Sequence, residues 1–407
     1  MKKSNDDLLN EETLITVEHH NKVNKTILFD FIDEKHFNRF LENYALPFDN
    51  LNNASMIMFL DFSCSKRFQL GVYYNIKASI AELLGEAEIQ RDSDIILFKI
   101  NAKGRDIREF IVASKLSAQY IHESNEDGRN NSPEKTFPKL GASVSKGRLT
   151  VKCVGQGSWN EFVFDGNVRV VYDIGTSYLH SKQTVKNLMS LRDLDYQRSR
   201  PIIVLSHWDV DHYHILLEAS DETIGSVKAF VYRSVVPNKT SKKLITRFQN
   251  LNPNALCPVQ EEPPPFGKQA SDQLKKIYGV KYGFHIFNGS KNRDRNKSGI
   301  LLVVKTHTQV IVLGADFYYE QINKYVLPSF NYKHDHYLIV PHHGGEAGKF
   351  IYENLNSICK DAIISVGGKY SYNHPLFDVE EELRKKKFHL INFKTKNSPF
   401  EYNLFLH

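Results

Sequence analysis

The chain has 407 residues, with 53 Lys and Arg against 47 Asp and Glu, a formal net charge of +6 at pH 7. Its 41% hydrophobic and 25% charged residues are ordinary for a globular protein and exclude a disordered or collagen-like chain. The length favours two domains. The small positive charge is compatible with DNA or RNA as a partner but does not by itself indicate one.

The four cysteines lie far apart and form no CxxC pair: Cys64, Cys153, Cys257 and Cys359. This spacing argues against a disulfide framework and a structural zinc knuckle, and it fits a reducing cytoplasm. The opening segment MKKSNDDLLNEE is polar, and no run approaches the ~18 apolar residues of a membrane helix. We therefore expect a cytoplasmic protein that makes no membrane contact.

Residues 1–125 are typical of an α+β domain. The predicted elements are strands at 16–32, 54–64 and 68–76, helices at 34–46 and 77–90, and a strand, turn and helix over 94–121. No catalytic constellation occurs in this block. We expect an accessory domain that recognises substrate, forms a homodimer or contacts a partner protein.

Composition changes after this block. Residues 126–147, EDGRNNSPEKTFPKLGASVSKG, are rich in Ser, Asn, Gly, Pro and charge, which is typical of a linker. From 148 to 407 short apolar runs alternate with helical segments, which predicts one α/β domain. The helical segments are 181–197, 242–251, 271–279, 349–360 and 379–387.

The segment VLSHWDVDHYHIL (204–216) places metal-type ligands directly after an apolar, strand-like run. His207, Asp209, Asp211 and His212 fall within six positions. Imidazole and carboxylate are the usual ligands of Zn²⁺, Mn²⁺ and Fe. A turn at the end of a buried strand can aim neighbouring side chains at one point, so we predict a metal site rather than a loop of chance composition.

Several other apolar runs end on residues of the same kinds: Asp173, Asp316, His342, His343 and His374. Any one of them alone carries little weight, because an Asp or His is common where a strand ends. Together they indicate that one rim of a sheet collects them.

In their order, these segments resemble the metallo-β-lactamase superfamily. SHWDVDHY resembles its HxHxDH motif with Asp209 in place of the second His, and this HxDxDH variant is similar to the hydrolase domain of ComEC-type DNA-uptake proteins. Further segments resembling that branch are CVGQGSWNEFVFDGNVRVVYDIGTS, NKSGILLVV with VIVLGAD, VPHHGGE and ISVGGKYSYNHP. The resemblance covers roughly 148–400, and nothing comparable marks the first 125 residues.

The resemblance implies a metallo-β-lactamase-like αββα sandwich behind the α+β accessory domain, with two divalent metal ions, Zn or Mn, at one edge. Asp209 adds negative charge and hard oxygen donors, which tilts the preference towards Mn²⁺. The implied ligands are His207 and Asp209 for the first ion, Asp211 and His212 for the second, Asp316 as the bridge, and His342 or His343 to complete the second site.

The resemblance also implies roles around these ligands. Of the two adjacent histidines we favour His342, the first residue past the strand and its proline. Asp173 would orient a ligand His or turn the chain. The branch's third His is not evident, with His285 and His307 as the candidates in that span.

The catalytic residues implied are Asp211, which would orient water and accept its proton, and His374, which would contact substrate or protonate the leaving group. A turn histidine before a proline is an equally good interpretation of His374. Gly344 and Gly345 would allow a phosphate to approach the backbone closely.

We predict a metal-dependent hydrolase that uses a metal-activated water, most simply a phosphodiesterase or nuclease acting on DNA or RNA. Basic stretches at 101–108, 290–297 and 382–389 would meet phosphates or form solvated faces. Two alternatives stay open: hydrolysis of a small nucleotide, phosphoester or lactone, and a binding module with degenerate metal sites. The architecture suggests bacterial stress response or anti-phage defence.

Overall fold

The computed structural model describes residues 12–21, 25–44, 54, 56–62, 64–69, 72–84, 87–92, 95–100, 106–114, 147–264, 271–292, 294–330, 333–352, 358–367, 374–394 and 401–407. The chain divides into two compact units. The first comprises Met1–Gly128 and Val235–Thr246, and the second comprises Arg129–Ser234 and Arg247–His407. No local pattern in the sequence indicated that Val235–Thr246 groups with the first unit. The predicted linker lies outside the described residues except at Gly147.

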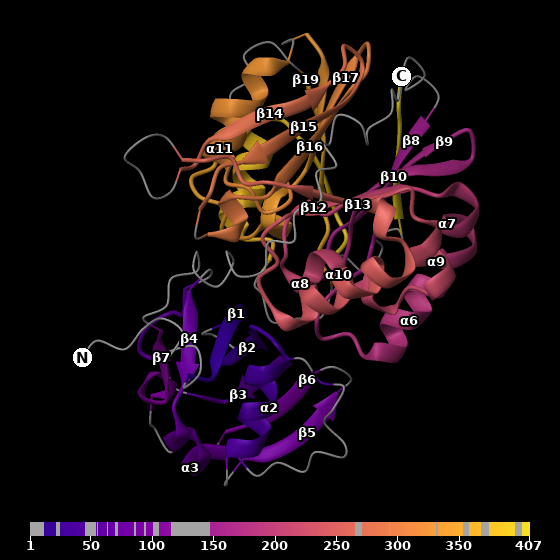
Figure 1. The fold of residues 1–407 in the computed structure, drawn as a ribbon. Coiled ribbons are helices and arrows are strands. Elements are labelled where there is room, and N and C mark those ends of the chain that lie inside the picture. Colours follow the sequence, from indigo (N-terminus) through magenta and orange to yellow (C-terminus); the bar gives the residue numbers. More distant parts are fainter. Residues whose placement is uncertain are drawn as a thin grey trace. The chain divides into compact units, whose positions relative to one another are not determined.

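The first unit is built on one seven-stranded sheet, drawn in indigo and purple in Figure 1. Its strand order is β5-β6-β3-β2-β1-β4-β7. Neighbouring strands are antiparallel except β3 and β6, which run parallel. The strands are β1 (Leu14–Asn21), β2 (Thr26–Phe31), β3 (Met56–Leu60), β4 (Tyr73–Ile76), β5 (Glu88–Asp92), β6 (Ile95–Lys99) and β7 (Ile111–Ala113).

Helix α2 (Glu34–Asn43) contributes its apolar side to the core of this unit. The helix begins where the Asp33 side chain accepts a hydrogen bond from the His36 backbone N–H at 3.0 Å, which satisfies one of the free donors of the first turn. The Phe37 ring packs edge-to-face on the Phe31 ring of β2, with centroids 5.2 Å apart. The unit is therefore an α+β domain.

Two predicted helices of the first unit are wrong in part. The predicted helix 77–90 is reduced to η2 (Ala78–Ile80) and α3 (Ala81–Leu84), and β5 follows. The predicted helix within 94–121 is replaced by η3 (Ile107–Glu109) and β7, while residues 101–105 and 115–121 lie outside the described residues. At these edges of the sheet the apolar residues have helical spacing, but hydrogen bonding to the neighbouring strand determines the conformation.

The segment Val235–Thr246 contacts the rest of the first unit through polar groups. The Thr240 backbone N–H donates to Asp30 Oδ2 at 3.2 Å, and Asn238 Nδ2 donates to Glu18 Oε1 at 3.1 Å. Asp30 is fully buried, and this burial, together with the nearby Glu18 charge, raises the pKa of Asp30 well above its usual value.

The second unit contains two seven-stranded sheets with related topology. The first has the order β13-β12-β11-β10-β9-β8-β21, and the second has the order β14-β15-β16-β17-β18-β19-β20. Each joins antiparallel strands to a parallel run, β10 to β13 in one and β17 to β20 in the other.

The strands of the first of these sheets are β8 (Gly147–Lys152), β9 (Trp159–Phe164), β10 (Asn167–Ile174), β11 (Ile202–Val204), β12 (Ala229–Arg233), β13 (Leu256–Val259) and β21 (Glu401–Phe405). Those of the second are β14 (Leu274–Gly279), β15 (Gly283–Gly289), β16 (Ile300–Lys305), β17 (Gln309–Leu313), β18 (Asp335–Ile339), β19 (Ile358–Ile364) and β20 (His389–Asn392).

The two sheets share one apolar core between them. Phe162 of β9 and Phe284 of β15 are both fully buried there, and their rings meet edge-to-face with centroids 5.0 Å apart. The outer face of the first sheet is covered by helices, as Phe248 of α10 (Lys239–Leu251) stacks on Phe230 of β12. Helix α12 (Phe377–Lys385) buries Leu383 on the outer face of the second sheet. The unit is therefore the αββα sandwich that the sequence predicted.

Three further helices, α6, α7 and α9, lie together on one side of the sheet that contains β8 to β13 (Figure 1). Their bounds are α6 (Lys182–Ser190), α7 (Asp193–Ser199) and α9 (Asp221–Ser226). The predicted helix 271–279 is wrong, since β14 occupies Leu274–Gly279 and pairs antiparallel with β15. The predicted helix 349–360 is also wrong at its end, where β19 begins at Ile358. Within the described ranges, none of the helices is both long and apolar enough to cross a membrane.

Candidate metal centre

The predicted ligands follow the carboxyl ends of parallel strands in both sheets of the second unit. Asp173 lies at the end of β10, and the segment 207–212 follows β11, its parallel neighbour. Asp316 follows β17, and His342 and His343 follow β18, again a parallel pair. Because parallel strands end at the same edge of a sheet, each sheet delivers its polar residues to one rim.

The loop after β11 is fixed on the side opposite to its ligands. Trp208 is buried, its indole Nε1–H donates to the Arg233 carbonyl at 2.9 Å, and its ring meets the Tyr213 ring edge-to-face. The chain then enters the short helix α8 (Val210–Tyr213), with Asp209 preceding its first residue. His207 and Asp209, on either side of the anchored Trp208, therefore face the same way.

The His-His turn after β18 has an uncommon backbone. His342 and His343 both adopt left-handed conformations, with φ of 52° and 54°. Two hydrogen bonds hold this turn: the His342 N–H donates to the Ala315 carbonyl at 2.8 Å, and the Gly345 N–H donates to the His342 carbonyl at 2.7 Å. The first bond ties the turn to the residue before Asp316. Left-handed conformations cost non-glycine residues free energy, so the turn is held by its surroundings.

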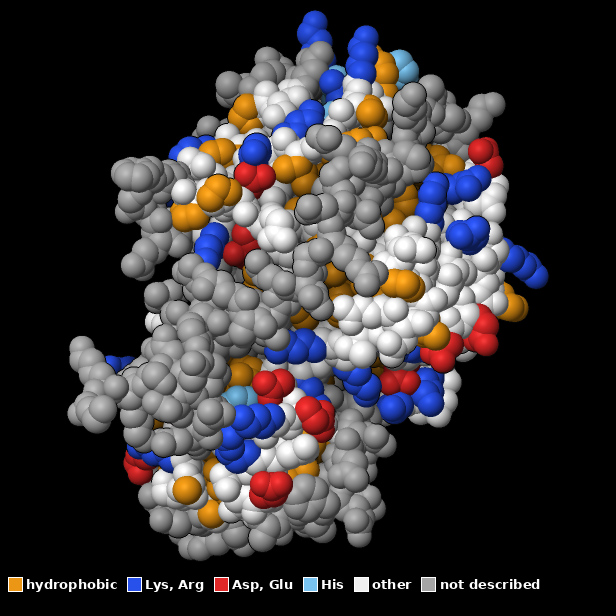
Figure 2. All heavy atoms as spheres, in the orientation of Figure 1, with side chains coloured by type: hydrophobic (Ala, Val, Ile, Leu, Met, Phe, Trp, Pro, Cys, Tyr) orange, Lys and Arg blue, Asp and Glu red, His pale blue; other side chains and the backbone are white. Residues whose placement is uncertain are grey.

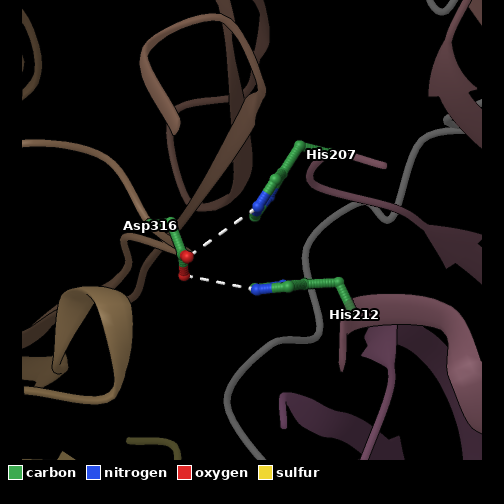
Figure 3. A group of neighbouring side chains, drawn as sticks. All are labelled: His207, His212 and Asp316. Atoms are coloured by element: carbon green, nitrogen blue, oxygen red, sulfur yellow. Dashed lines mark ion pairs between the residues drawn. The ribbon is translucent and has the colours of Figure 1, made fainter. Parts of the chain in front are cut away.

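One group that can hold a metal ion consists of His207, His212 and Asp316. In Figure 3 both imidazoles point at the Asp316 carboxylate. His212 Nε2 lies 3.3 Å from Asp316 Oδ1, and His207 Nε2 lies 3.8 Å from Asp316 Oδ2. Asp316 therefore offers one oxygen to each histidine, and its role as a bridge between two metal ions remains a prediction.

A second group consists of Asp211, His212 and His343. His343 Nε2 lies 3.5 Å from Asp211 Oδ2, and His212 Nε2 lies 3.9 Å from Asp211 Oδ1. The preference for His342 at this position is corrected to His343. His342 instead directs Nε2 towards Asp316 Oδ2 at 3.7 Å. The left-handed turn sends the two adjacent side chains to different carboxylates, which residue order alone does not reveal.

Each of these four histidines is held from behind by its other ring nitrogen. His212 Nδ1 donates to Asp173 Oδ2 at 2.9 Å, and His343 Nδ1 donates to the Ser365 carbonyl at 2.8 Å. His342 Nδ1 similarly donates to the Glu346 carbonyl. His207 Nδ1 lies 3.0 Å from Ser206 Oγ, whose hydroxyl donates to Asp173 Oδ2. Such bonds fix the tautomer that leaves Nε2 available for a metal.

Asp173 thus has the orienting role expected of it, and Ser206 and Ser365 are supporting residues that the sequence analysis missed. Ser206 directly precedes His207 and is fully buried, with its backbone N–H donating to Asp173 Oδ1 at 2.7 Å. Ser206 lies between β11 and the predicted ligand His207, and this position is the feature from which its supporting role could have been predicted. Ser365 follows β19 and donates through Oγ to the Gly157 carbonyl at 2.7 Å.

Asp209 belongs to neither metal-capable group among the described residues. Its Oδ2 lies 3.3 Å from His207 Nε2, but its Oδ1 pairs with Arg295 Nε at 3.0 Å. Burial acts to raise the pKa of Asp209, and the charges of Arg295 and His207 outweigh it, lowering the pKa to about 2. Asp209 is therefore an ionised carboxylate, and the guanidinium of Arg295 lies beside it.

The ionisable groups of the centre shift one another's pKa values. Burial opposes ionisation of Asp316, but the neighbouring histidines, His342 first, hold the pKa of this carboxyl well below its usual range. Burial likewise opposes charge on His212, yet Asp316 and Asp173 raise its pKa well above the ordinary value. Without a metal, these shifts favour an ionised Asp316 and a protonated His212, so a cation that binds to His212 has to displace a proton.

His374 lies beside the His-His turn, with its ring centroid 5.7 Å from that of His342. Burial and the charges of His342 and His343 lower the pKa of His374 to about 3. The ring is neutral at pH 7 in this state, which suits contact with a substrate better than donation of a proton. His374 remains a prediction as a catalytic residue.

Gly344 and Gly345, where a phosphate was expected to approach the backbone, lie against the 374–375 segment. A Cβ on Gly345 would lie 2.3 Å from His374 Cε1, and a Cβ on Gly344 would lie 2.6 Å from Pro375 Cβ. These two glycines make room for the 374–375 segment.

Neither candidate for a third histidine joins the centre. His285 is buried on β15 with its ring edge-on to Phe330, and His307 stacks on Tyr282. Neither belongs to a metal-capable group within the described ranges.

Two of the three basic stretches lie at least partly in ion pairs, and phosphate contact remains a prediction for all three. Arg295, within 290–297, pairs with Asp209. In the stretch 382–389, Arg384 pairs with Glu380 and Lys385 with Glu382, on the same helix. Residues 101–105 of the third stretch lie outside the described residues.

The donor set fits a divalent transition metal. His207, His212 and His343 present buried Nε2 atoms that have no hydrogen-bond partner within the described part of the chain, and Asp316 Oδ1 is in the same situation. Several buried polar atoms without hydrogen bonds, converging from three segments of the chain, would be costly unless a cation joins them. Imidazole nitrogens with carboxylate oxygens are the ligands of Zn²⁺, Mn²⁺ and Fe²⁺.

Two solved structures are similar to this chain at low identity. One is the metallo-β-lactamase fold protein YhfI from Bacillus subtilis, with a TM-score of 0.36, 12% identity, and coverage of 64% of this chain and 100% of that one. The other is a mutant of the CmlA β-hydroxylase, with a TM-score of 0.36, 12% identity, and coverage of 72% and 60%. This similarity is too low to carry an argument, so the fold rests on the strand order above. No protein-family model and no curated protein matches the sequence.

Proposed function

We propose that the protein is a metal-dependent hydrolase that cleaves phosphodiester bonds in nucleic acid. One observation carries the proposal: four histidines, each held through Nδ1, direct Nε2 at the carboxylates of Asp211, Asp316 and Asp209. Imidazoles whose Nδ1 is hydrogen-bonded and whose Nε2 converges with carboxylate oxygens are the arrangement that a metal centre requires.

The residues that would hold metal are His207, His212 and Asp316 in one group and Asp211, His212 and His343 in the other. Bound divalent ions in such a centre lower the pKa of water and neutralise charge on the substrate. Asp211 is the more exposed carboxylate, with 16% of its side chain accessible against 5% for Asp316. Its pKa is lowered: burial opposes this shift, and the charge of His212 outweighs burial. Asp211 is therefore ionised, and its carboxylate can orient a water molecule by accepting a hydrogen bond from it.

Support for nucleic acid as substrate comes from three features. The HxDxDH variant resembles ComEC-type hydrolase domains, the net charge is +6, and the carboxylates supply the hard oxygens that suit Mn²⁺ and phosphate chemistry. On the face drawn in Figure 2, the described Lys and Arg side chains lie among Asp and Glu. This face is therefore of mixed charge.

The test is an activity screen on protein stripped of metal and reloaded with Mn²⁺ or Zn²⁺. Single- and double-stranded DNA, RNA and bis(p-nitrophenyl) phosphate run in parallel. We expect nucleic acid to be cleaved, and Asp211→Asn or His343→Gln to abolish cleavage. His389→Gln, on an imidazole whose side chain is 74% exposed, is the matched control and keeps full activity.

Two results would redirect the proposal. Cleavage of the small ester alone would indicate a small-molecule hydrolase. No cleavage of any substrate by protein that binds metal would indicate a binding module.

A further inference from the structure

Arg295 forms a buried ion pair with the residue that replaces the second histidine of the ligand motif. Its Nε lies 3.0 Å from Asp209 Oδ1, and its Nη1 donates to the Trp208 carbonyl at 3.0 Å. Only 13% of the Arg295 side chain and 10% of the Asp209 side chain are accessible. Two groups of the ligand loop, one charged and one neutral, therefore fix the guanidinium.

The turn that carries Arg295 is itself held. η7 (Arg295–Lys297) begins where Asp294 Oδ1 accepts the Asn296 N–H at 3.1 Å. Tyr318 donates its hydroxyl hydrogen bond to Asp294 Oδ2 at 3.1 Å, and Gln321 Nε2 donates to the Lys297 carbonyl at 3.1 Å. Tyr318 and Gln321 come shortly after Asp316 in the chain. The segment that supplies the cation is thus tied to the segment that supplies the bridging carboxylate.

The two sides of the centre consequently differ in charge. Asp211 lies 3.9 Å from His212 Nε2 and 3.5 Å from His343 Nε2, and imidazole can bind a metal in its neutral form. Asp209 pairs with a guanidinium, which cannot lose its proton in a protein. A permanent cation 3.0 Å from one oxygen of Asp209 competes for this carboxylate and repels a metal on the His207 side.

We propose that Arg295 weakens metal binding on the His207 side, so that the protein holds one divalent ion tightly, at Asp211, His212 and His343 with Asp316, and a second ion weakly. This inference rests on the proposed metal-dependent function and specifies how many ions the centre retains. Arg295 is a positioning residue here, acting on the centre through Asp209.

The test is a calorimetric titration of metal-free protein with Mn²⁺ and with Zn²⁺, together with metal counts after equilibrium dialysis. For the wild-type protein we expect one tight equivalent and a second that binds at least ~10-fold more weakly. Arg295→Gln removes the charge but keeps a polar side chain, and we expect the second equivalent to bind at least ~10-fold more tightly. Arg295→Lys keeps the charge and should resemble the wild type.

Matched variants separate a local effect from loss of fold. Arg247→Gln breaks an ion pair of the same 3.0 Å Nε–Oδ1 geometry with Asp221, outside the centre, and both equivalents should be unchanged. Asp209→Asn should leave the tight equivalent within about threefold of the wild type, because Asp209 is not one of its ligands. This variant therefore controls for damage to the tight site, and the wild-type titration keeps the inference testable if Arg295→Gln does not fold.

The titrations distinguish failure of the inference from failure of the proposed function. Two tight equivalents in the wild type, or weaker binding after Arg295→Gln, would overturn the inference and make Arg295 a support for a ligand. Unchanged binding after Arg295→Gln would overturn it too. A wild-type protein that binds neither Mn²⁺ nor Zn²⁺ would overturn the proposed function, and the inference with it.

Discussion

Asp173→Asn removes one charge behind the metal centre while keeping the shape of the side chain. The Asp173 carboxylate is fully buried and accepts three hydrogen bonds, from Ser206 N at 2.7 Å, Ser206 Oγ at 3.0 Å and His212 Nδ1 at 2.9 Å. Asp173 has a φ of 60°, a conformation that Asn also tolerates. The backbone therefore does not obstruct the substitution, and its effect reports on the hydrogen bonds.

The magnitude follows from counting acceptors. An amide has a single oxygen, so at least one of the donors would face the Asn NH₂ group. Leaving one buried donor unsatisfied costs about 1–3 kcal/mol, and we expect the free energy of unfolding of the metal-free protein to fall by that amount. If His212 changes tautomer to recover a bond, its Nε2 carries the proton and cannot bind a metal. We therefore expect metal affinity to fall about 10- to 100-fold, or about 1.4–2.7 kcal/mol.

The assays are urea unfolding of the metal-free protein and calorimetric titration with Mn²⁺ and Zn²⁺. Asp361→Asn is the matched control, because Asp361 Oδ1 and His389 Nδ1 also lie 2.9 Å apart but 74% of that His side chain is exposed. The control should cost no more than about 1 kcal/mol and should leave metal affinity unchanged. Lowered stability with unchanged metal affinity in Asp173→Asn would refute the orienting role and leave Asp173 as a residue that only shapes the turn.

Three further substitutions test other parts of the structure. In Gly175→Ala the new Cβ would lie 1.7 Å from the Asp211 carbonyl oxygen, so we expect a loss of about 1–3 kcal/mol in urea unfolding and weaker metal binding by calorimetry; wild-type affinity would contradict this packing. Phe284→Ala removes the fully buried ring that meets Phe162 between the sheets, and we expect a loss of about 3–5 kcal/mol in urea unfolding; a loss below about 1 kcal/mol would argue against facing sheets. Because burial raises the pKa of Asp30 well above its unfolded value of 3.8, its stabilising contribution is present below that pH and is lost as pH rises through the folded pKa. Asp30→Asn should therefore protect the β2 amides from hydrogen exchange more at pH 8 than at pH 5, and equal effects at both would contradict the shift.

The residue types of the centre were predictable because each follows an apolar run that had to become a buried strand. His207, Asp211, His212 and Asp316 were named on that ground, and the structure brings them together. The same local logic failed for β14, whose Lys-rich sequence has helical spacing but whose backbone pairs with β15 at the edge of a sheet. Edge pairing is a long-range contact that no local window of sequence contains.

Other assignments depended on contacts between distant segments. The choice between His342 and His343 was decided by two successive left-handed residues, which place adjacent side chains on different carboxylates. The sequence analysis expected the stretch that holds Arg295 to meet phosphates or form a solvated face, whereas Arg295 pairs with Asp209, 86 positions earlier in the chain.

By itself, the sequence determined that an α/β sandwich would end its strands on imidazole and carboxylate groups, because apolar runs and their polar ends are local properties. Only the tertiary structure decided which atoms face one another: the nitrogens held from behind, the histidine that meets Asp211, and the guanidinium that meets Asp209. These relations depend on where separate loops converge at the rim of two sheets, and a few ångströms there decide whether a carboxylate is offered to a metal or to an arginine.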